Sequence, residues 1–229
     1  MNKIFLLLLL ASLCARCEQG DFERARQSMV QDQIVARGVM DSPTLRAMRT
    51  VPRHEFVPAE LADHAYDDAP LPIGHGQTIS QPYIVAFMTE VIRPRKGERV
   101  LEVGTGSGYQ AAVLAEIVDS VFTIEIVPEL ARSSAERLRR LGYQNVTVRQ
   151  GDGYQGWAEH APFDAILVTA AAEEIPKPLV EQLKDGGVMV IPVGPVESVQ
   201  ALTLVRKQGK DAVTRTLLPV RFVPLIRQR

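Results

Sequence analysis

The sequence is poor in several residue types that mark particular classes of protein. Only two of its 229 residues are cysteine, and both lie within the first 17. The rest of the chain therefore has no thiol for a disulfide, a metal site or nucleophilic catalysis. Aromatic residues make up only 6% and charged residues 23%, against 46% hydrophobic residues. This is the balance of an ordinary globular domain, and it excludes disordered, collagen-like and polytopic membrane chains.

The sequence also has no excess of charge of either sign. Its 26 Lys and Arg residues are matched by 27 Asp and Glu residues, giving a net charge of −1. Domains that bind nucleic acids usually carry a basic surplus, so no nucleic-acid partner is expected. The four histidines do not have the spacing of metal ligands, and no metal site is predicted. They are His54, His64, His75 and His160.

Long hydrophobic runs are absent except for a short one near the N-terminus. The apolar stretch Ile4–Leu13 follows Lys3 and is half the length of about 20 residues that a membrane helix needs. A positive charge, a short apolar run and small residues near Ala15 resemble a secretory signal peptide. Residues 1–17 are therefore predicted to be a signal-like leader, although a mis-assigned start or a frayed apolar helix would look similar.

The sequence pattern of the remaining chain changes near residue 95. Residues 21–95 combine helical patterns with a loop rich in proline and glycine, and they are predicted to form an N-terminal helical cap. From residue 96 to 229, strands alternate with helices, which is typical of a doubly wound parallel sheet. We predict a Rossmann-like α/β fold whose mostly parallel sheet ends in an antiparallel hairpin. Predicted helices cover 21–38, 81–92, 111–117 and 128–141, with a short one starting at 42; predicted strands cover 99–103, 121–126, 146–150, 165–169, 188–193, 201–205 and 212–220.

A glycine-rich turn follows the first predicted strand of this core. Leu101–Tyr109 contains the pattern Gly-x-Gly-x-Gly. Glycines at a strand end let a ligand approach the backbone, and the next helix presents its positive end to that ligand. Gly104 and Gly106 are therefore predicted to bind a cofactor. A turn of this kind alone also occurs as an ordinary tight connection between a strand and a helix.

Two acidic residues lie at or just after the ends of the next two predicted strands. Glu125 lies 21 residues after Gly104, where a carboxylate can accept both hydroxyls of a ribose. Asp152 lies between two glycines after the third strand, where it could accept a hydrogen bond from an adenine amino group. Each residue has a structural alternative. Glu125 could be a solvated acid at a strand end, and Asp152 could belong to an ordinary Asp-Gly turn.

The spacing of the glycines favours one type of nucleoside. A dinucleotide site has the pattern Gly-x-Gly-x-x-Gly, whereas this chain has Tyr109 at the position of the last glycine. The acid Glu102, just before the glycines, is unfavourable for a pyrophosphate and suits an ammonium or sulfonium group. The predicted cofactor is therefore S-adenosylmethionine, and not NAD.

These motifs resemble those of class I methyltransferases and, more narrowly, of the protein-L-isoaspartate O-methyltransferase family. The resemblance extends from about residue 24 to 225, and the leader is its one clear departure. The most specific part is Thr78–Pro82, because generic methyltransferases lack it. The segments that carry the resemblance are Val51–Arg53, Phe56–Pro58, Gly76–Pro82, Val100–Tyr109, Gly151–Gly153, Phe163–Thr169, Leu183–Gly194 and Val220–Leu225.

The resemblance implies transfer of a methyl group to the side-chain carboxylate of L-isoaspartyl residues in damaged proteins. Ser80 would be the catalytic residue beside the reactive methyl group, and Thr78 and Ile79 would flank the substrate. Residues 21–95 would hold the substrate loop, and 96–229 would form the S-adenosylmethionine-binding core. Structural alternatives are that Ser80 caps the following helix and that Thr78 and Ile79 belong to an ordinary loop.

Two other functions remain possible from the sequence. One is a methyltransferase for a small molecule or RNA, and the other is a nucleoside-binding module without catalysis. The expected partners are proteins or peptides with isoaspartyl residues, and we expect a monomer with no stable membrane association. The leader favours export to the periplasm. S-adenosylmethionine is made in the cytosol, however, so the cytoplasm is the preferred location.

Overall fold

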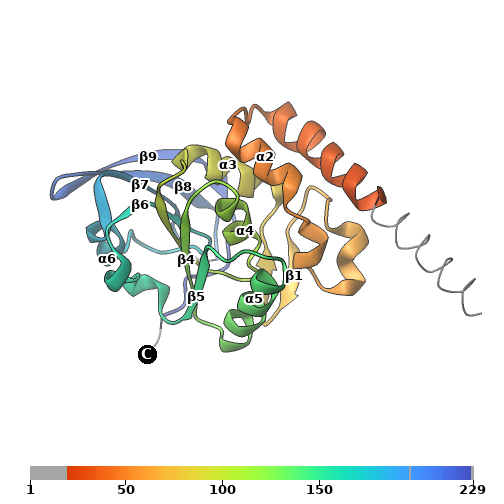
Figure 1. Cartoon of the computed structure of the whole chain (residues 1–229). Helices are drawn as coiled ribbons and strands as arrows, with labels where there is room; N and C mark the ends of the chain where they lie inside the picture. The colour runs from red at the N-terminus through yellow and green to blue at the C-terminus, as the bar shows by residue number, and fades with distance from the viewer. Residues whose placement is uncertain (1–19, 196, 228–229) are drawn as a thin grey trace, which may run out of the picture.

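The computed structural model describes residues 20–195 and 197–227. The predicted leader, residues 1–17, lies outside this part of the chain. A seven-stranded sheet forms the centre, and the N-terminal helices lie at one end of it (Figure 1). Within the described ranges, no helix is long and apolar enough to cross a membrane.

The order of the strands in the sheet confirms the predicted fold class. The order is β5-β4-β3-β6-β7-β8-β9. Strands β5 to β7 are parallel, whereas β8 runs antiparallel to β7 and β9 antiparallel to β8. The strands are β3 (Arg99–Val103), β4 (Ser120–Glu125), β5 (Val146–Gln150), β6 (Phe163–Val168), β7 (Leu183–Val193), β8 (Gln200–Gln208) and β9 (Asp211–Val220).

The first predicted helix ends where the sequence indicates. Residues 20–28 are α-helical, and the chain continues through a π-helical and a 3₁₀ segment to Gly38. Gly38 has φ +88°, a left-handed conformation that glycine adopts without strain. The described helices that follow residue 28 are η1 (Met29–Ile34), η2 (Val35–Arg37), α2 (Ser42–Thr50), η3 (Arg53–Phe56), η4 (Ala59–His64), α3 (Pro82–Ile92), α4 (Tyr109–Ala115), α5 (Pro128–Arg140), η5 (Gly153–Gln155), η6 (Ala158–His160) and α6 (Lys177–Glu181).

The central strands are buried on both faces, which explains their nearly continuous apolar sequences. Along β3, Val100 belongs to one hydrophobic cluster, while Leu101 and Val103 belong to a second. The first cluster includes residues of α3 and α4, and the second includes Trp157 and Leu179. Because successive side chains of a strand point to opposite faces, the sheet separates the two clusters. This packing fixes the strand ends that carry the glycine-rich turn.

Several short elements were not predicted from the sequence. Residues predicted as loop contain a small antiparallel pair, β1 (Leu71–Gly74) and β2 (Gln77–Ile79). Its turn places His75 at φ +53° and Gly76 at φ +69°. The short helix α6 was also missed. Strand β7 begins at Leu183, five residues before the predicted start.

Candidate active site

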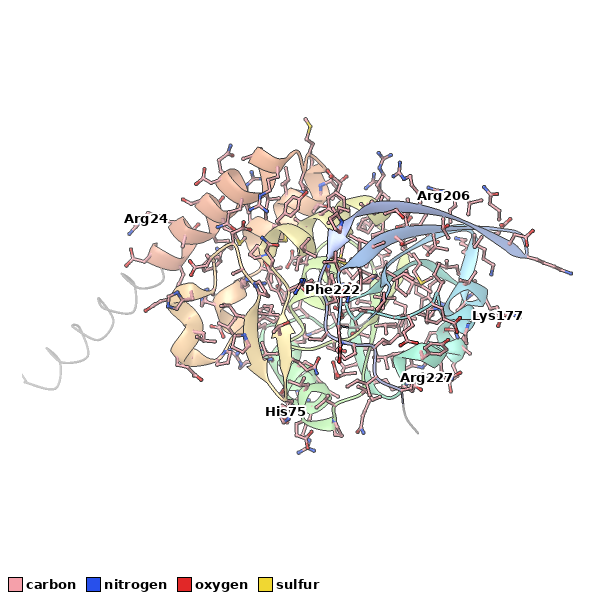
Figure 2. All side chains as sticks on the ribbon, turned by 180° about the vertical axis from the view of Figure 1, so that it is seen from behind. Arg24, His75, Lys177, Arg206, Phe222 and Arg227 are labelled. Atoms are coloured by element: carbon pink, nitrogen blue, oxygen red, sulfur yellow. The ribbon has the colours of Figure 1, made fainter. Side chains whose placement is uncertain are left out.

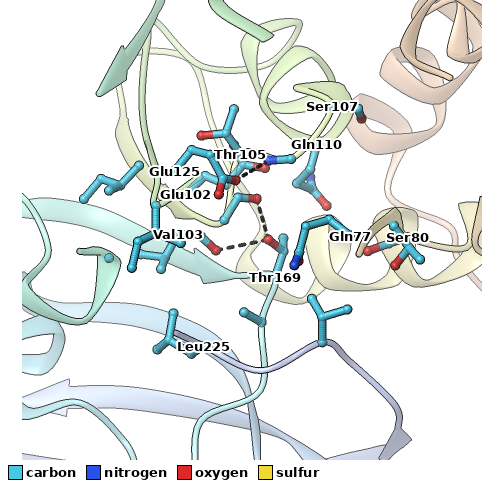
Figure 3. Close-up of a pocket in the computed structure, with 18 of the residues that line it drawn as sticks. Gln77, Ser80, Glu102, Val103, Thr105, Ser107, Gln110, Glu125, Thr169 and Leu225 are labelled. Atoms are coloured by element: carbon cyan, nitrogen blue, oxygen red, sulfur yellow. Dashed lines mark hydrogen bonds between the residues drawn. The ribbon is translucent and has the colours of Figure 1, made fainter. Parts of the chain in front are cut away.

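A cavity lies at the carboxyl ends of β3, β4 and β6. Strands β3 and β6 are neighbours, and the chain proceeds from them in opposite directions across the sheet. Ligands of doubly wound sheets bind at such a reversal of strand order. Figure 3 shows Glu102, Glu125 and Thr105 on one side of the cavity and Ser80 on the other. The lining comes from five main parts of the chain: 77–80, 102–107, 124–126, 169–170 and 223–226.

The glycine-rich turn brings the ends of β3 and β6 very close together. Gly104 has φ +98°, and a Cβ atom placed on it would lie 2.4 Å from Oγ1 of Thr169. The Thr169 hydroxyl is 2.6 Å from the carbonyl oxygen of Gly104, to which it donates a hydrogen bond. Neither the backbone conformation nor the space permits a side chain at residue 104. Both predicted glycines, Gly104 and Gly106, line the cavity.

Glu125 lies at the end of β4 and is only 5% exposed. Its Oε2 accepts a hydrogen bond from the Gly106 amide at 2.7 Å, and its Oε1 accepts one from the Val127 amide at 2.9 Å. The alternative of a solvated strand-end acid is therefore wrong. A carboxylate can accept about four hydrogen bonds, so two acceptor sites remain for a ligand such as a ribose. Its role in ribose binding stays a prediction.

Glu102 is completely buried and also lines the cavity. Burial raises the pKa of its carboxyl group to about 8; a hydrogen bond from Thr123 opposes this rise and the nearby Glu125 adds to it. Oε1 of Glu102 has no hydrogen-bond partner among the described residues. Leaving a buried acceptor without a partner is costly. This oxygen therefore fits a ligand that brings a cationic donor, as the ammonium group of S-adenosylmethionine would.

Asp152 lies beside the cavity and is absent from its lining, although the neighbouring Gly153 takes part in it. The Asp152 carboxylate accepts a hydrogen bond from the Tyr154 amide at 2.9 Å and so caps the short helix η5. This bond is what the Asp-Gly turn alternative predicts. Its interaction with an adenine group remains a prediction. The other predicted site residues all line the cavity; they are Thr78, Ile79, Ser80, Glu102, Gly104, Gly106 and Glu125.

The structural alternatives for Ser80 and Thr78 are both wrong. Helix α3 begins at Pro82, its N-cap residue is Gln81, and no side chain makes a capping bond there. Ser80 is therefore not the cap. Thr78 belongs to β2, where it is paired with Pro72 of β1.

A second hollow of about 310 Å³ adjoins the first cavity. Thr78, Ser80, Thr169 and Val223 line both spaces. The second space has further walls from the start of α3 and from residues 219–223, which are the end of β9 and the residues that follow it. Ser80 thus stands at the boundary between two spaces, one of which contains the two buried carboxylates. Such an arrangement can hold two different molecules in contact.

Residues 223–226, in the C-terminal segment, form a wall of the cavity that was not predicted from the sequence. The Leu225 amide donates to the carbonyl of Ala171 at 2.8 Å, and the Ala171 amide donates to the carbonyl of Val223 at the same distance. Figure 2 shows this segment from behind, between Phe222 near the centre and Arg227 near the lower edge. The only signal in the sequence was the segment Val220–Leu225, which resembles the corresponding segment of the family but was given no role. Thr169 was missed in the same way.

The fold and the position of this cavity are those of a class I methyltransferase. A sequence profile of the protein-L-isoaspartate(D-aspartate) O-methyltransferase (PCMT) family matches residues 24–229. The chain belongs to this family.

Individual relatives agree with this assignment. A protein-L-isoaspartate O-methyltransferase of Opitutus terrae is 57% identical over 228 residues, covering 98% of both chains. A Polaromonas relative, protein-L-isoaspartate O-methyltransferase 2, is 61% identical over 191 residues, covering 83% of this chain and 90% of its own. A crystal structure of a Plasmodium falciparum protein has a TM-score of 0.78 at 28% identity, covering 89% of this chain and 99% of that one. That protein is described as a protein-L-isoaspartate O-methyltransferase in complex with S-adenosyl-L-homocysteine.

Proposed function

We propose that this protein transfers a methyl group from S-adenosylmethionine to the side-chain carboxylate of L-isoaspartyl residues in damaged proteins, which initiates their repair. The observation that carries the proposal is the position of Ser80 between two adjoining spaces. One space has buried carboxylates suited to a cationic nucleoside, and the other would receive the polypeptide. Family membership supports the same reaction.

The cofactor would be held by Glu102, Gly104, Gly106, Glu125 and Asp152. The close contact at Gly104 and the unpartnered Oε1 of Glu102 both fit such a ligand. When bound, S-adenosylmethionine supplies a methyl group made electrophilic by a sulfonium. Glu125 would accept hydrogen bonds from ribose hydroxyls while the Gly106 and Val127 amides hold its orientation.

The residues of β2 and the following loop would act on the substrate. A carboxyl group with an ordinary pKa near 4 is ionised at neutral pH, so the nucleophile needs no general base. The Ser80 hydroxyl would donate a hydrogen bond that orients the substrate carboxylate, and Thr78 and Ile79 would flank the substrate chain. Holding two reactants in a reactive geometry can lower a barrier by several kcal/mol.

Location, assembly and domain roles are part of the same proposal. Residues 21–95 would position the substrate, and residues 96–229 would bind the cofactor. We favour a monomer in the cytoplasm, where the cofactor is made, with export through the leader as the alternative. Cell fractionation with N-terminal sequencing tests the location: a periplasmic chain that begins near residue 16–18 would contradict it.

A transfer assay tests the reaction. The purified chain is given cofactor with a labelled methyl group and two peptides that differ only in having isoaspartate or aspartate at one position. Label is expected on the isoaspartyl peptide alone. Transfer to small molecules or RNA, or cofactor binding without any transfer, would instead select one of the two competing functions.

A further inference from the structure

Two threonine hydroxyls and one carboxylate form a buried row beside the cofactor cavity. The hydroxyl oxygens of Thr105 and Thr123 are 2.6 Å apart, and the Thr123 hydroxyl donates to Oε2 of Glu102 at 2.5 Å. Thr105 is 3% exposed, and Thr123 and Glu102 are fully buried. The row joins the glycine-rich turn to β4 and β3. It exists because the parallel register of the two strands pairs Glu102 with Thr123.

The direction of these hydrogen bonds follows from counting protons. An ionised carboxylate can only accept, and each threonine hydroxyl has one proton to donate. If Thr123 gives its proton to Glu102, it must receive the proton of Thr105. Donation therefore runs from Thr105 through Thr123 to Glu102. A hydrogen bond to a charged acceptor is stronger than one between neutral groups, so the row stabilises the ionised carboxylate.

Among the described residues, Thr123 is the one side chain that lowers the pKa of Glu102 and so favours its ionised form. Glu125, at the end of β4, is the charged group that influences it, and that influence is repulsive. The residue opposite Glu102 on β6, Leu167, is apolar. Glu125 differs in this respect, because two backbone amides hold its oxygens. For Glu102, Thr123 supplies the only hydrogen bond from the described residues.

We propose that Thr123, supported by Thr105, is a positioning residue that orients the Glu102 carboxyl group and favours its ionised form when the cationic amino group of the cofactor approaches its free oxygen. This inference rests on the proposed binding of S-adenosylmethionine beside Glu102. Neither threonine needs to touch the ligand through its hydroxyl. The row would therefore select ligands by charge rather than by shape.

Two ligands that differ in this cationic group test the proposal. S-adenosylhomocysteine carries the amino-acid part, whereas 5′-methylthioadenosine keeps the nucleoside and sulfur but has a methyl group in place of the whole amino-acid part, including its cationic amino group. Calorimetry on the full-length chain gives the Kd of each. In Thr123→Val we expect the Kd for S-adenosylhomocysteine to rise about tenfold, as for loss of a hydrogen bond to a charge. The Kd for 5′-methylthioadenosine should change by less than about twofold.

Three further variants separate this role from a general loss of structure. Thr123→Ser keeps the hydroxyl and should bind both ligands like the wild type. Thr44→Val is the matched control, because Thr44 is also fully buried and donates to a carboxylate, that of Asp41, at 2.8 Å in helix α2, which contributes no residue to the lining of the cavity. It should alter neither Kd. If Thr123→Val does not fold, Thr105→Val tests the hydrogen bond from Thr105 to Thr123. In that variant we expect the Kd for S-adenosylhomocysteine alone to rise about threefold.

The Glu102→Gln variant distinguishes failure of this inference from failure of the proposed site. If Glu102→Gln leaves the affinity for S-adenosylhomocysteine unchanged, the assignment of Glu102 to the cofactor is wrong. If Glu102→Gln weakens binding but Thr123→Val does not, or if Thr123→Val weakens both ligands equally, the positioning role is overturned. In the Glu102→Gln background, the effect of Thr123→Val should disappear, because coupled residues are not additive.

Discussion

The two sides of the active-site cavity are built differently. On the side of the sheet, the polar groups of Glu102, Thr105, Thr123 and Glu125 are buried and joined to one another or to the backbone. On the side of the loops, Thr78 is exposed and Ser80 is half-buried. Neither side-chain hydroxyl has a hydrogen-bond partner in the described part of the chain. Arg221, in the wall of the second hollow, is exposed and equally unpaired there.

This difference matches the two molecules that the protein would bind. A small cofactor of fixed shape is best held by groups that are already oriented, because little ordering is left to do on binding. Polypeptide substrates vary around the modified residue, and unpaired groups on loops can adapt to them. We therefore expect changes on the sheet side to alter stability and cofactor affinity. Changes on the loop side should alter the rate of transfer alone.

The largest expected effect concerns the stability of the ligand-free protein. Burial raises the pKa of Glu102 to about 8, from 4.5. A group whose pKa is higher in the folded state contributes stability that is complete at low pH and is lost as the pH rises through the folded value. Between about pH 4.5 and 8, the unfolding free energy of Glu102→Gln relative to that of the wild type should rise with pH, by at most about 1.4 kcal/mol per pH unit. Urea unfolding at several pH values measures this, and a constant difference would contradict it.

Substitution of Gly104 should be the next largest change. In Gly104→Ala, the new Cβ would meet Thr169 in a left-handed backbone conformation. We expect a loss of about 3 kcal/mol of unfolding free energy and of measurable cofactor binding. Gly142→Ala is the control, since Gly142 has φ +89° but no atom within 4 Å of the new Cβ. It should lose only about 1–2 kcal/mol and bind cofactor normally. Equal losses in the two variants would show that the close contact at Gly104 does not matter.

Removal of the second buried carboxylate, that of Glu125, should weaken cofactor binding directly. Glu125→Ala deletes the acceptor of the Gly106 and Val127 amides and the predicted partner of the ribose. Each lost charge-assisted hydrogen bond should cost on the order of 1.5–3 kcal/mol. Calorimetry with S-adenosylhomocysteine measures the change, with Glu129→Ala, an exposed residue of α5, as the control. An unchanged Kd would remove Glu125 from the site.

Ser80 tests the loop side of the comparison. In Ser80→Ala we expect kcat for the isoaspartyl peptide to fall about tenfold to a hundredfold, through loss of one hydrogen bond to an anion. Because Ser80 does not cap α3, the unfolding free energy should stay within about 0.5 kcal/mol of the wild type. Cofactor affinity should also be unchanged. A variant with wild-type kcat would exclude Ser80 from the mechanism. A large loss of stability would show that Ser80 has a structural role, as the buried groups on the sheet side do.

The sequence predicted the sheet well because its strands are apolar runs with clear ends. Strands β3 and β5 have the predicted bounds. The β1–β2 pair was missed because its strands have four and three residues, contain Pro72 and Gly74, and depend on a positive φ at His75. Secondary-structure propensities do not predict a positive φ at a histidine. Helix α6, with five residues, is too short to show a helical period.

The site was predictable in its residue types but not in its internal contacts. The glycines and the acids lie at or just after the carboxyl ends of predicted strands, so their meeting at one sheet edge could be expected. The alternative of Ser80 as a helix cap was wrong although the sequence held a signal against it: Pro82 at the first helical position puts the cap at Gln81. The row from Thr105 to Glu102 could not be foreseen, since it depends on the register between β3 and β4.

The wall formed by residues 223–226 has a thermodynamic consequence. A cavity lined by segments as distant as residues 77–80 and 223–226 exists only when all of them are folded together. A ligand in it therefore binds the native state and not the unfolded chain. At a concentration 100 times its Kd, such a ligand adds about 2.7 kcal/mol to the unfolding free energy. The protein should accordingly resist heat and proteolysis better as the cofactor concentration rises, with a gain in unfolding free energy that grows with the logarithm of that concentration.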